Sequence, residues 1–166
     1  MRPVRKRNRL ASYDYSACGT YFITICTAGR EKWLWSSEDA GATISRPHAV
    51  PLSDAGRTAD DAINAIPLHY STVRVDHYVI MPNHIHLLLT LLPADGRLIA
   101  APTLSQVVGQ LKRTISIKTG RSLWQKSFHD HIVRDQHDLE QIWMYIEHNP
   151  WNWKTDCFYQ KEPLQD

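Results

Sequence analysis

The stretch MPNHIHLLL at residues 81–89 decides the predicted fold. Its first three residues favour a turn, and the apolar run that follows, with histidines at alternate positions, is typical of a buried strand over residues 84–91. Residues 72–80 alternate in part between apolar and polar side chains, which predicts a second strand antiparallel to the first. This pattern places four side chains of the second strand on one face: Val73, Val75, His77 and Val79.

The remaining elements are predicted outward from this hairpin. Residues 21–27 are β-branched and aromatic and indicate another buried strand, whereas residues 33–51 indicate a turn or short hairpin with a loop. Three amphipathic helices and a short extended piece at 131–133 complete the order. The helix limits are set by Ser53 and Pro67, by a Thr103/Gln106 capping box and Gly120, and by Asp135 and Asn149-Pro150, where the residue before proline is pushed out of the helical region.

This order predicts an α+β protein with a ferredoxin-like antiparallel sheet and helices packed on it. The histidine pair lies on a central strand of that sheet, and Tyr145 lies on the C-terminal helix. The length of 166 residues fits one domain. Residues 1–12 form a basic N-terminal arm of that domain, and residues 151–166 form an irregular tail.

Composition limits the environment of the chain. Apolar residues make up 43% and charged residues 22%, and the longest apolar run is far shorter than the roughly 20 residues of a membrane helix. The basic start at residues 1–9 lacks the apolar region of a secretory signal. Cys18, Cys26 and Cys157 form no CxxC pair and fit a reducing compartment as packing residues. We therefore expect a cytoplasmic protein with no membrane partner.

Positive charge is unevenly distributed, although the net charge is only +2. Basic residues crowd the N-terminal arm and recur in the second half, while acidic residues gather in the first half. This asymmetry permits a nucleic-acid-binding face, and a solvated tail with ordinary surface lysines is the alternative. The candidate DNA-binding residues are Arg5, Lys6, Arg7, Lys112, Arg113 and Arg134.

The residues with the clearest chemical potential are His84 and His86. In a strand, both imidazoles point to the same face roughly 6 to 7 Å apart at the backbone, so they can converge on one metal ion. Two structural histidines are the alternative, because a metal site needs a third ligand.

Tyr145 and Asn149 can approach that face from the last helix. They are four residues apart and project from the same side of the helix. A packing tyrosine and a helix-ending asparagine are the alternatives for each residue alone. Two imidazoles and an amide oxygen leave a divalent ion its full charge and open positions, which suits Mg²⁺ or Mn²⁺ acting on a phosphodiester.

Other chemistries for the histidine pair fit poorly. A histidine-triad hydrolase needs a third alternating histidine where this chain has Leu88, and a cupin needs a glycine-rich approach where this chain has residues 81–83. No Gly-x-Ser-x-Gly elbow, Walker loop or dinucleotide-binding glycine loop is present. A structural zinc module lacks its usual cysteine pair.

Residues 81–89, joined to YIEHNP at 145–150, resemble the HUH single-tyrosine transposases of the IS200/IS605 type, in particular the REP-associated tyrosine transposases. The resemblance implies Tyr145 as nucleophile and a metal held by His84, His86 and Asn149. Departures are the tail with Trp151-Asn-Trp153 and Asp156, and the long stretch 33–51. The similarity also covers residues 13–15, 21–27, Arg30-Glu31, 74–76, 108–112, Trp124-Gln125 and 131–135.

This family implies transposition and recombination of DNA. Single-stranded DNA is cleaved through a 5′-phosphotyrosine intermediate and rejoined, and REP-like hairpin DNA is the expected partner. A DNA-hairpin-binding or regulatory protein that keeps the fold without cutting is the alternative. Monomer and homodimer both remain open.

Overall fold

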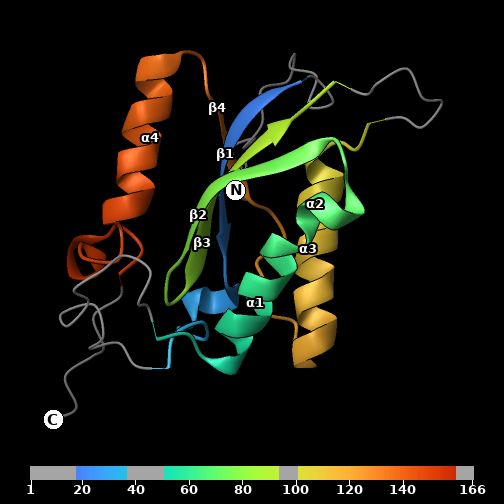
Figure 1. Ribbon diagram of the computed structural model, residues 1–166. Coiled ribbons are helices and arrows are strands. Elements are labelled where there is room, and N and C mark those ends of the chain that lie inside the picture. The colour runs from blue at the N-terminus through green and yellow to red at the C-terminus, as the bar shows by residue number, and fades with distance from the viewer. Residues whose placement is uncertain (1–17, 37–50, 94–100, 160–166) are drawn as a thin grey trace, which may run out of the picture.

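The computed structural model describes residues 18–36, 51–93 and 101–159 (Figure 1). The N-terminal arm and residues 37–50 of the predicted loop lie outside the described residues. At the ends of that loop, Trp35 and Leu52 form an isolated antiparallel bridge. The elements are, in order, β1 (Gly19–Cys26), η1 (Ala28–Arg30), α1 (Asp54–Asn64), α2 (Ile66–His69), β2 (Val73–Ile80), β3 (His84–Leu91), α3 (Leu104–Thr119), β4 (His129–Ile132), α4 (Gln136–His148) and η3 (Trp153–Thr155).

The strands form one four-stranded sheet in the order β2-β3-β1-β4. Every neighbouring pair is antiparallel, and the pairing of β1 with β3 runs from Gly19 opposite Leu91 to Cys26 opposite His84. The predicted α+β, ferredoxin-like arrangement is therefore confirmed. The histidines lie at the start of the central strand β3, as the sequence predicted.

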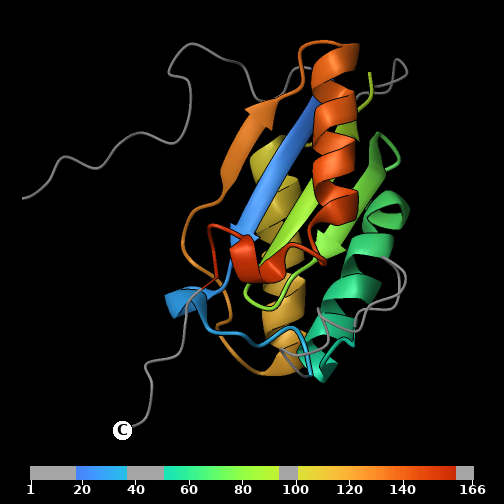
Figure 2. The same cartoon turned by 90° about the vertical axis from the view of Figure 1, so that its left-hand side faces the viewer.

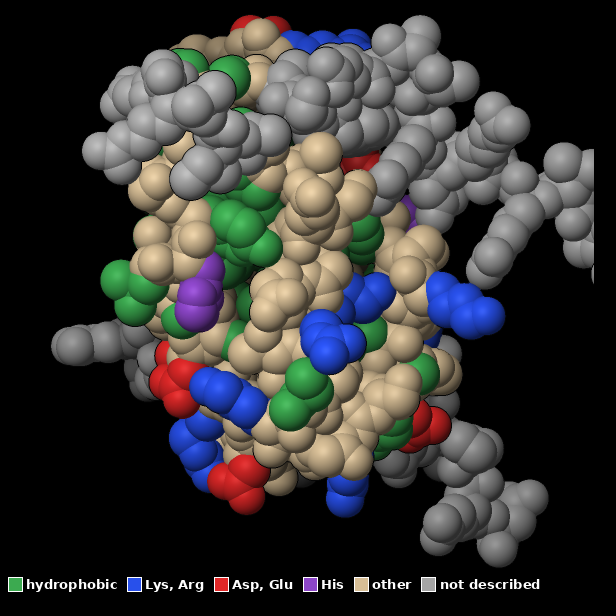
Figure 3. Space-filling model, turned by 90° about the vertical axis from the view of Figure 1, so that its right-hand side faces the viewer, with side chains coloured by type: hydrophobic (Ala, Val, Ile, Leu, Met, Phe, Trp, Pro, Cys, Tyr) green, Lys and Arg blue, Asp and Glu red, His purple; other side chains and the backbone are tan. Residues whose placement is uncertain are grey.

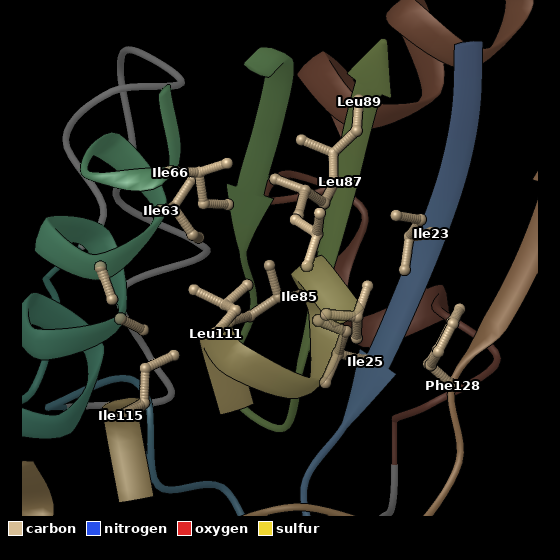
Figure 4. Packing of buried hydrophobic residues seen from close by; sticks show 14 of the residues in the cluster. Ile23, Ile25, Ile63, Ile66, Ile85, Leu87, Leu89, Leu111, Ile115 and Phe128 are labelled. Atoms are coloured by element: carbon tan, nitrogen blue, oxygen red, sulfur yellow. The ribbon is translucent and has the colours of Figure 1, made fainter. Parts of the chain in front are cut away.

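One face of the sheet is covered by α1, α2 and α3 and holds the larger hydrophobic core (Figures 1 and 4). Alternate residues of the two central strands point into it, including Ile23, Ile25, Ile85 and Leu87, which are at most 1% exposed. They meet apolar side chains of α1 and α3 such as Ile63 and Leu111. Apolar packing dominates this face, and hydrogen bonds from Tyr78 to Asp60 and from Asn64 to Tyr78 join β2 to α1 at its edge.

The opposite face is crossed by α4, with the chain after it folded near one end of the strands (Figure 2). A smaller core forms here from Val79, Met81, Leu88, Ile142, Ile146, Trp35 and Trp153. His84 and His86 share this face because they alternate with Ile85 and Leu87, which point to the other face. The histidine side chains therefore lie on the face of the sheet that is covered by the tyrosine-bearing helix α4.

A β-bulge in β2 changes one prediction. The register with β3 shifts between Val75 and His77, so that Asp76 is the extra residue. Before the bulge, Val73 and Val75 pack into the larger core, whereas after it Val79 packs under α4 and His77 stacks on Trp143. The prediction that these strand residues share one face is wrong, because an extra residue reverses the alternation.

The predicted helix starts are confirmed by their caps. The side chains of Ser53, Thr103 and Asp135 accept backbone N–H bonds at the starts of α1, α3 and α4, and Thr103 and Gln106 form the reciprocal capping box. Gly120 ends α3 with φ 67°.

Two reasons given for helix ends are wrong. Pro67 does not end the first helix, because α1 ends at Asn64 and Pro67 lies in the first turn of α2, where no backbone N–H is needed. Asn149 follows α4 with φ −56° and ψ −42°, so Pro150 does not force it out of the helical region. Within the described residues, no helix is long and apolar enough to cross a membrane.

Candidate active site on the α4 face of the sheet

The two histidines of β3 face each other with their Nε2 atoms 3.1 Å apart. Adjacent ligand atoms of an octahedral ion, each about 2.1 to 2.2 Å from the metal, lie about 3.0 to 3.1 Å apart. The ring nitrogens of His84 and His86 therefore already have the spacing of two ligands on one small divalent cation.

Each histidine is oriented through its other ring nitrogen. Nδ1 of His84 lies 2.8 Å from Oδ1 of Asn83, and Nδ1 of His86 lies 2.9 Å from Oγ1 of Thr24. When Nδ1 carries the proton and donates it to these oxygens, the Nε2 lone pairs are free to bind a cation. Asn83 and Thr24 were not among the predicted site residues. Thr24 meets His86 only through the pairing of β1 with β3, and Asn83 was interpreted as part of the turn before the strand.

Both imidazoles are neutral in the folded protein. The exposed fraction is 0% for His84 and 1% for His86. Burial lowers the pKa of His86 to about 3. Burial, followed by the charges of His86 and Arg30, lowers the pKa of His84 well below its ordinary value. Neutral imidazole is the form that binds metal, so the environment fits the predicted ligand role.

Tyr145 reaches the histidine pair from α4. Its hydroxyl oxygen lies 3.3 Å from Nε2 of His86, and its ring makes an edge contact with Phe22. The side chain is 42% exposed, so the hydroxyl lies where the buried histidines meet the surface. Burial raises the pKa of Tyr145, the Asp156 carboxylate raises it further, and the Asn149 side chain lowers it. The phenol is therefore protonated at neutral pH.

Asn149 lies one turn beyond Tyr145 and is buried, with an exposed fraction of 3%. Among the described residues, its Oδ1 atom has no hydrogen-bond partner. A buried amide oxygen without a partner is costly, and a bound cation is one way to satisfy it. The role of Asn149 as a metal ligand stays a prediction, and this unpaired oxygen fits it.

Asp156 is a candidate ligand that was not predicted from the sequence. Its carboxylate and the ring nitrogens of His84 and His86 all lie within 4.8 Å of one another. It belongs to the segment after η3, which has no helical or strand period, and the sequence showed Asp156 only as part of an unusual tail. No pattern in the sequence places it beside the histidines.

The same tail segment covers the histidine pair. The Phe158 ring lies 4.6 Å from the His84 ring between centroids, and the Phe158 carbonyl accepts a hydrogen bond of 2.9 Å from Nδ2 of Asn83. Tyr159 packs edge-on against Trp153. The Phe158 contact helps to bury His84, and the rings of Phe22 and Tyr145 pack against His86.

The predicted DNA-binding residues differ in what surrounds them. Arg5, Lys6 and Arg7 lie outside the described residues. Arg113 and Arg134 are exposed, whereas the Lys112 ammonium donates to backbone carbonyls of Gln125, Lys126 and Ser127. On the face shown in Figure 3, Lys and Arg side chains are scattered and not gathered into one patch. The DNA-binding role of these residues stays a prediction.

Comparison with solved structures defines the class of fold. The structure of a REP-associated tyrosine transposase bound to a REP hairpin matches with a TM-score of 0.55 and 21% identity, covering 80% of this chain and 69% of that one. A Deinococcus radiodurans protein with a provisional transposase assignment matches at 18% identity, over 84% of this chain and 95% of that one, but its TM-score of 0.45 is too low to carry an argument. The resemblance to REP-associated tyrosine transposases is confirmed at the level of the fold.

Sequence comparison defines the family. An uncharacterized protein of Haemophilus influenzae is 30% identical over 175 residues, covering 93% of each chain. The chain belongs to the same family as this Haemophilus protein. No family model matches it.

Proposed function

We propose that this chain is a metal-dependent single-tyrosine DNA transposase that cleaves and rejoins single-stranded DNA. The observation that carries the proposal is the meeting of three groups: the hydroxyl of Tyr145 lies 3.3 Å from Nε2 of His86, which lies 3.1 Å from Nε2 of His84. A packing tyrosine needs no such contact. The transposase that shares the fold supports the same reading.

The proposed reaction is a transesterification at phosphorus. The oxygen of Tyr145 attacks the scissile phosphate, a bond forms between this oxygen and phosphorus, and the bond from phosphorus to the 3′-oxygen breaks. The phenol loses its proton and the departing 3′-oxygen gains one, so the products are a 5′-phosphotyrosine and a free 3′-hydroxyl. A later 3′-hydroxyl can reverse the step, which makes rejoining independent of a nucleotide cofactor.

The residues that would hold the metal are His84 and His86, with oxygen ligands from Asn149 and Asp156. The spacing of the ring nitrogens, the unpaired Asn149 oxygen and the nearby Asp156 carboxylate support this set. A bound Mg²⁺ or Mn²⁺ would supply positive charge that stabilises the negative charge developing on the phosphate. The protein's own contribution is to fix the neutral imidazoles through Asn83 and Thr24 and to hold Tyr145 against them.

Hairpin DNA with an adjoining single strand is the proposed partner. The solved transposase with this fold is bound to a REP hairpin, and we extend that class of ligand to this chain. The exposed Arg113 and Arg134 and the basic arm with Arg5, Lys6 and Arg7 are the proposed phosphate contacts. Lys112 is the weakest member of this set because its ammonium already binds three backbone carbonyls.

One observation favours the alternative of a DNA-hairpin-binding protein that does not cut. Both histidines are buried beneath the segment that carries Asp156 and Phe158. A phosphodiester must displace part of this segment to reach the site. If the segment stays in place when DNA binds, the protein recognises the hairpin without cleaving it.

A covalent-adduct assay separates the two functions. The protein is incubated with 5′- or 3′-labelled hairpin oligonucleotides carrying single-stranded flanks, with Mg²⁺ or Mn²⁺, and run on a denaturing gel. The enzyme predicts an adduct that Tyr145→Phe abolishes, since phenylalanine keeps the ring contacts and removes the nucleophile. Tyr70→Phe, on the other side of the sheet, is the matched control and keeps the adduct. Tight hairpin binding with no adduct under any metal condition overturns the enzyme in favour of the binding protein.

A further inference from the structure

Arg30 has an unusual backbone next to the site. Among the described residues it is the only non-glycine residue with positive φ, at 59°. A side chain with a Cβ is strained in this left-handed region, where glycine is not. The conformation is held by hydrogen bonds of the turn: the Arg30 N–H donates to the Thr27 carbonyl at 3.1 Å, and the Arg30 carbonyl accepts from Nδ2 of Asn83 at 3.2 Å.

This turn brings the side chain to the histidines. The central carbon of the Arg30 guanidinium lies 4.5 Å from the centroid of the Phe158 ring, and that ring lies 4.6 Å from the ring of His84. The Arg30 charge contributes to the lowered pKa of His84, which is consistent with this proximity. Arg30 and His84 thus both contact the Phe158 ring, Arg30 through its guanidinium and His84 at an interplanar angle of 42°.

The positive charge on Arg30 has no protein counter-ion within the parts of the chain that the structure describes. The ion pairs there join Arg57 to Asp54, Arg74 to Asp76, and His131 to Asp138. Arg30 is half-buried. A cation–π contact over an aromatic ring uses none of the guanidinium N–H groups, so they can still donate to an anion beside the ring.

We propose that Arg30 binds a phosphate of the DNA strand at or next to the bond that Tyr145 attacks, which makes it a phosphate-binding residue of this active site. This inference rests on the proposed function. The planar fork of arginine matches two phosphate oxygens at once, a geometry that lysine does not reproduce. The Phe158 ring contacts the guanidinium, and the turn at Arg30 places this side chain beside the site.

The strain gives a test that an ordinary surface arginine does not offer. Glycine adopts φ near 59° without the penalty of a side chain, so Arg30→Gly is expected to raise the melting temperature or leave it unchanged. The same variant is expected to slow adduct formation roughly 100-fold, the usual loss when one charge-stabilising group is removed. Arg30→Lys keeps the charge and the strain. Its rate of adduct formation is expected to lie between those of Arg30→Gly and the wild-type protein. Arg57→Ala, an exposed arginine of α1, is the charge-matched control and keeps the full rate.

The site of contact is located with modified DNA. Methylphosphonate replaces the scissile phosphate and each of its neighbours in turn, which removes one negative charge at a time. Wild-type protein is expected to lose rate at the phosphate that Arg30 contacts, whereas Arg30→Gly is expected to be insensitive to replacement at that same position.

The outcomes separate this inference from the proposed function. If wild-type protein forms no adduct, the proposed function and this inference both fail. If wild-type protein forms the adduct and Arg30→Gly forms it at the same rate, the inference fails and the proposed function stands. Equal sensitivity of both proteins to every methylphosphonate also overturns the inference.

Discussion

The two faces of the sheet differ in what they bury. The α1/α3 face buries apolar side chains that fill a core. The α4 face buries two neutral imidazoles and an amide oxygen that has no partner among the described residues, with a half-exposed tyrosine beside them. Burial of apolar groups stabilises the fold, and burial of polar groups costs stability unless they are satisfied. The difference suggests that one face maintains the structure while the other is arranged for chemistry.

Two neighbouring residues of β3 allow the difference between the two faces to be tested by single substitutions. His86 and Leu87 are adjacent, equally buried, and point to opposite faces. Substitution of each therefore perturbs one face with little direct effect on the other.

The largest expected effect is on the α4 face. His86→Leu replaces an imidazole by an apolar side chain of similar volume and removes a proposed metal ligand. We expect adduct formation to fall by at least roughly 1000-fold, about 4 kcal/mol of barrier, while the free energy of unfolding changes by less than about 1.5 kcal/mol. The gel assay and urea denaturation measure the two quantities. A variant that cuts DNA at the wild-type rate contradicts the assigned role of His86.

The corresponding substitution on the α1/α3 face is expected to lower stability and to leave the reaction unchanged. Leu87→Ala removes a side chain that is 0% exposed and packs in the larger core (Figure 4). We expect a loss of about 3 kcal/mol in the free energy of unfolding, from lost burial and the cavity left behind. Adduct formation per folded molecule, measured at low temperature, is expected to be unchanged. A large loss of rate in the folded protein would show that the faces are not independent.

A smaller effect is expected at the oxygen ligands. Asp156→Asn removes a negative charge close to the histidines, and Asn149→Ala removes the unpaired amide oxygen. We expect each to weaken Mn²⁺ binding roughly 10-fold, about 1.4 kcal/mol, as measured by titration calorimetry on protein freed of metal. Unchanged binding in one variant removes that residue from the ligand set. Unchanged binding in both contradicts a metal site with oxygen ligands from α4 and the tail.

The buried imidazoles also make stability depend on pH. The folded pKa of His86 is lowered to about 3, and the unfolded pKa is about 6.5. Between these values the unfolded chain binds a proton that the folded chain does not, so stability falls as the pH falls, by up to about 1.4 kcal/mol per pH unit. Stability from this group is complete above about pH 6.5.

Urea denaturation between pH 7 and pH 5, with a chelator present, measures this slope. His86→Leu is expected to reduce it, whereas Leu87→Ala is expected to lower stability equally at each pH. If the two variants show the same slope, His86 is not the group that titrates.

Much of the fold could be predicted because its signals are local. β-Branched, aromatic and apolar runs located β1 and β3, and side-chain caps located the starts of α1, α3 and α4. The bulge at Asp76 could not be predicted, since a single inserted residue leaves each half of the strand with an ordinary alternation. Its consequence, the reversal of faces between Val75 and His77, appears only when β2 is paired with β3.

The candidate site, like the fold, could be predicted only in part from the sequence. The convergence of His84 and His86 follows from strand geometry, and helix geometry brings Tyr145 and Asn149 to one side of α4. The prediction that Tyr145 is the nucleophile came from the family resemblance and not from the helical periodicity. Asp156, Phe158 and Arg30 were missed as site residues because they lie outside the long helices and strands. The path of such short turns and irregular segments depends on tertiary contacts, such as the hydrogen bond from Asn83 to Phe158.

The smallest expected effects lie on α3, far from the chemistry. A Cβ added at Gly109 meets nothing within 4 Å, and the residue is exposed inside the helix. Gly109→Ala is therefore expected to stabilise the protein by up to about 1 kcal/mol, because alanine restricts the unfolded chain and favours helix. Gly120→Ala is expected to cost a similar amount, since its φ of 67° is strained for alanine. Thermal denaturation and the adduct assay test both variants, and the rate of adduct formation should not change in either. If Gly109→Ala slows the reaction, α3 takes part in cleavage beyond the phosphate contact proposed for Arg113, and the separation of the two faces is incomplete.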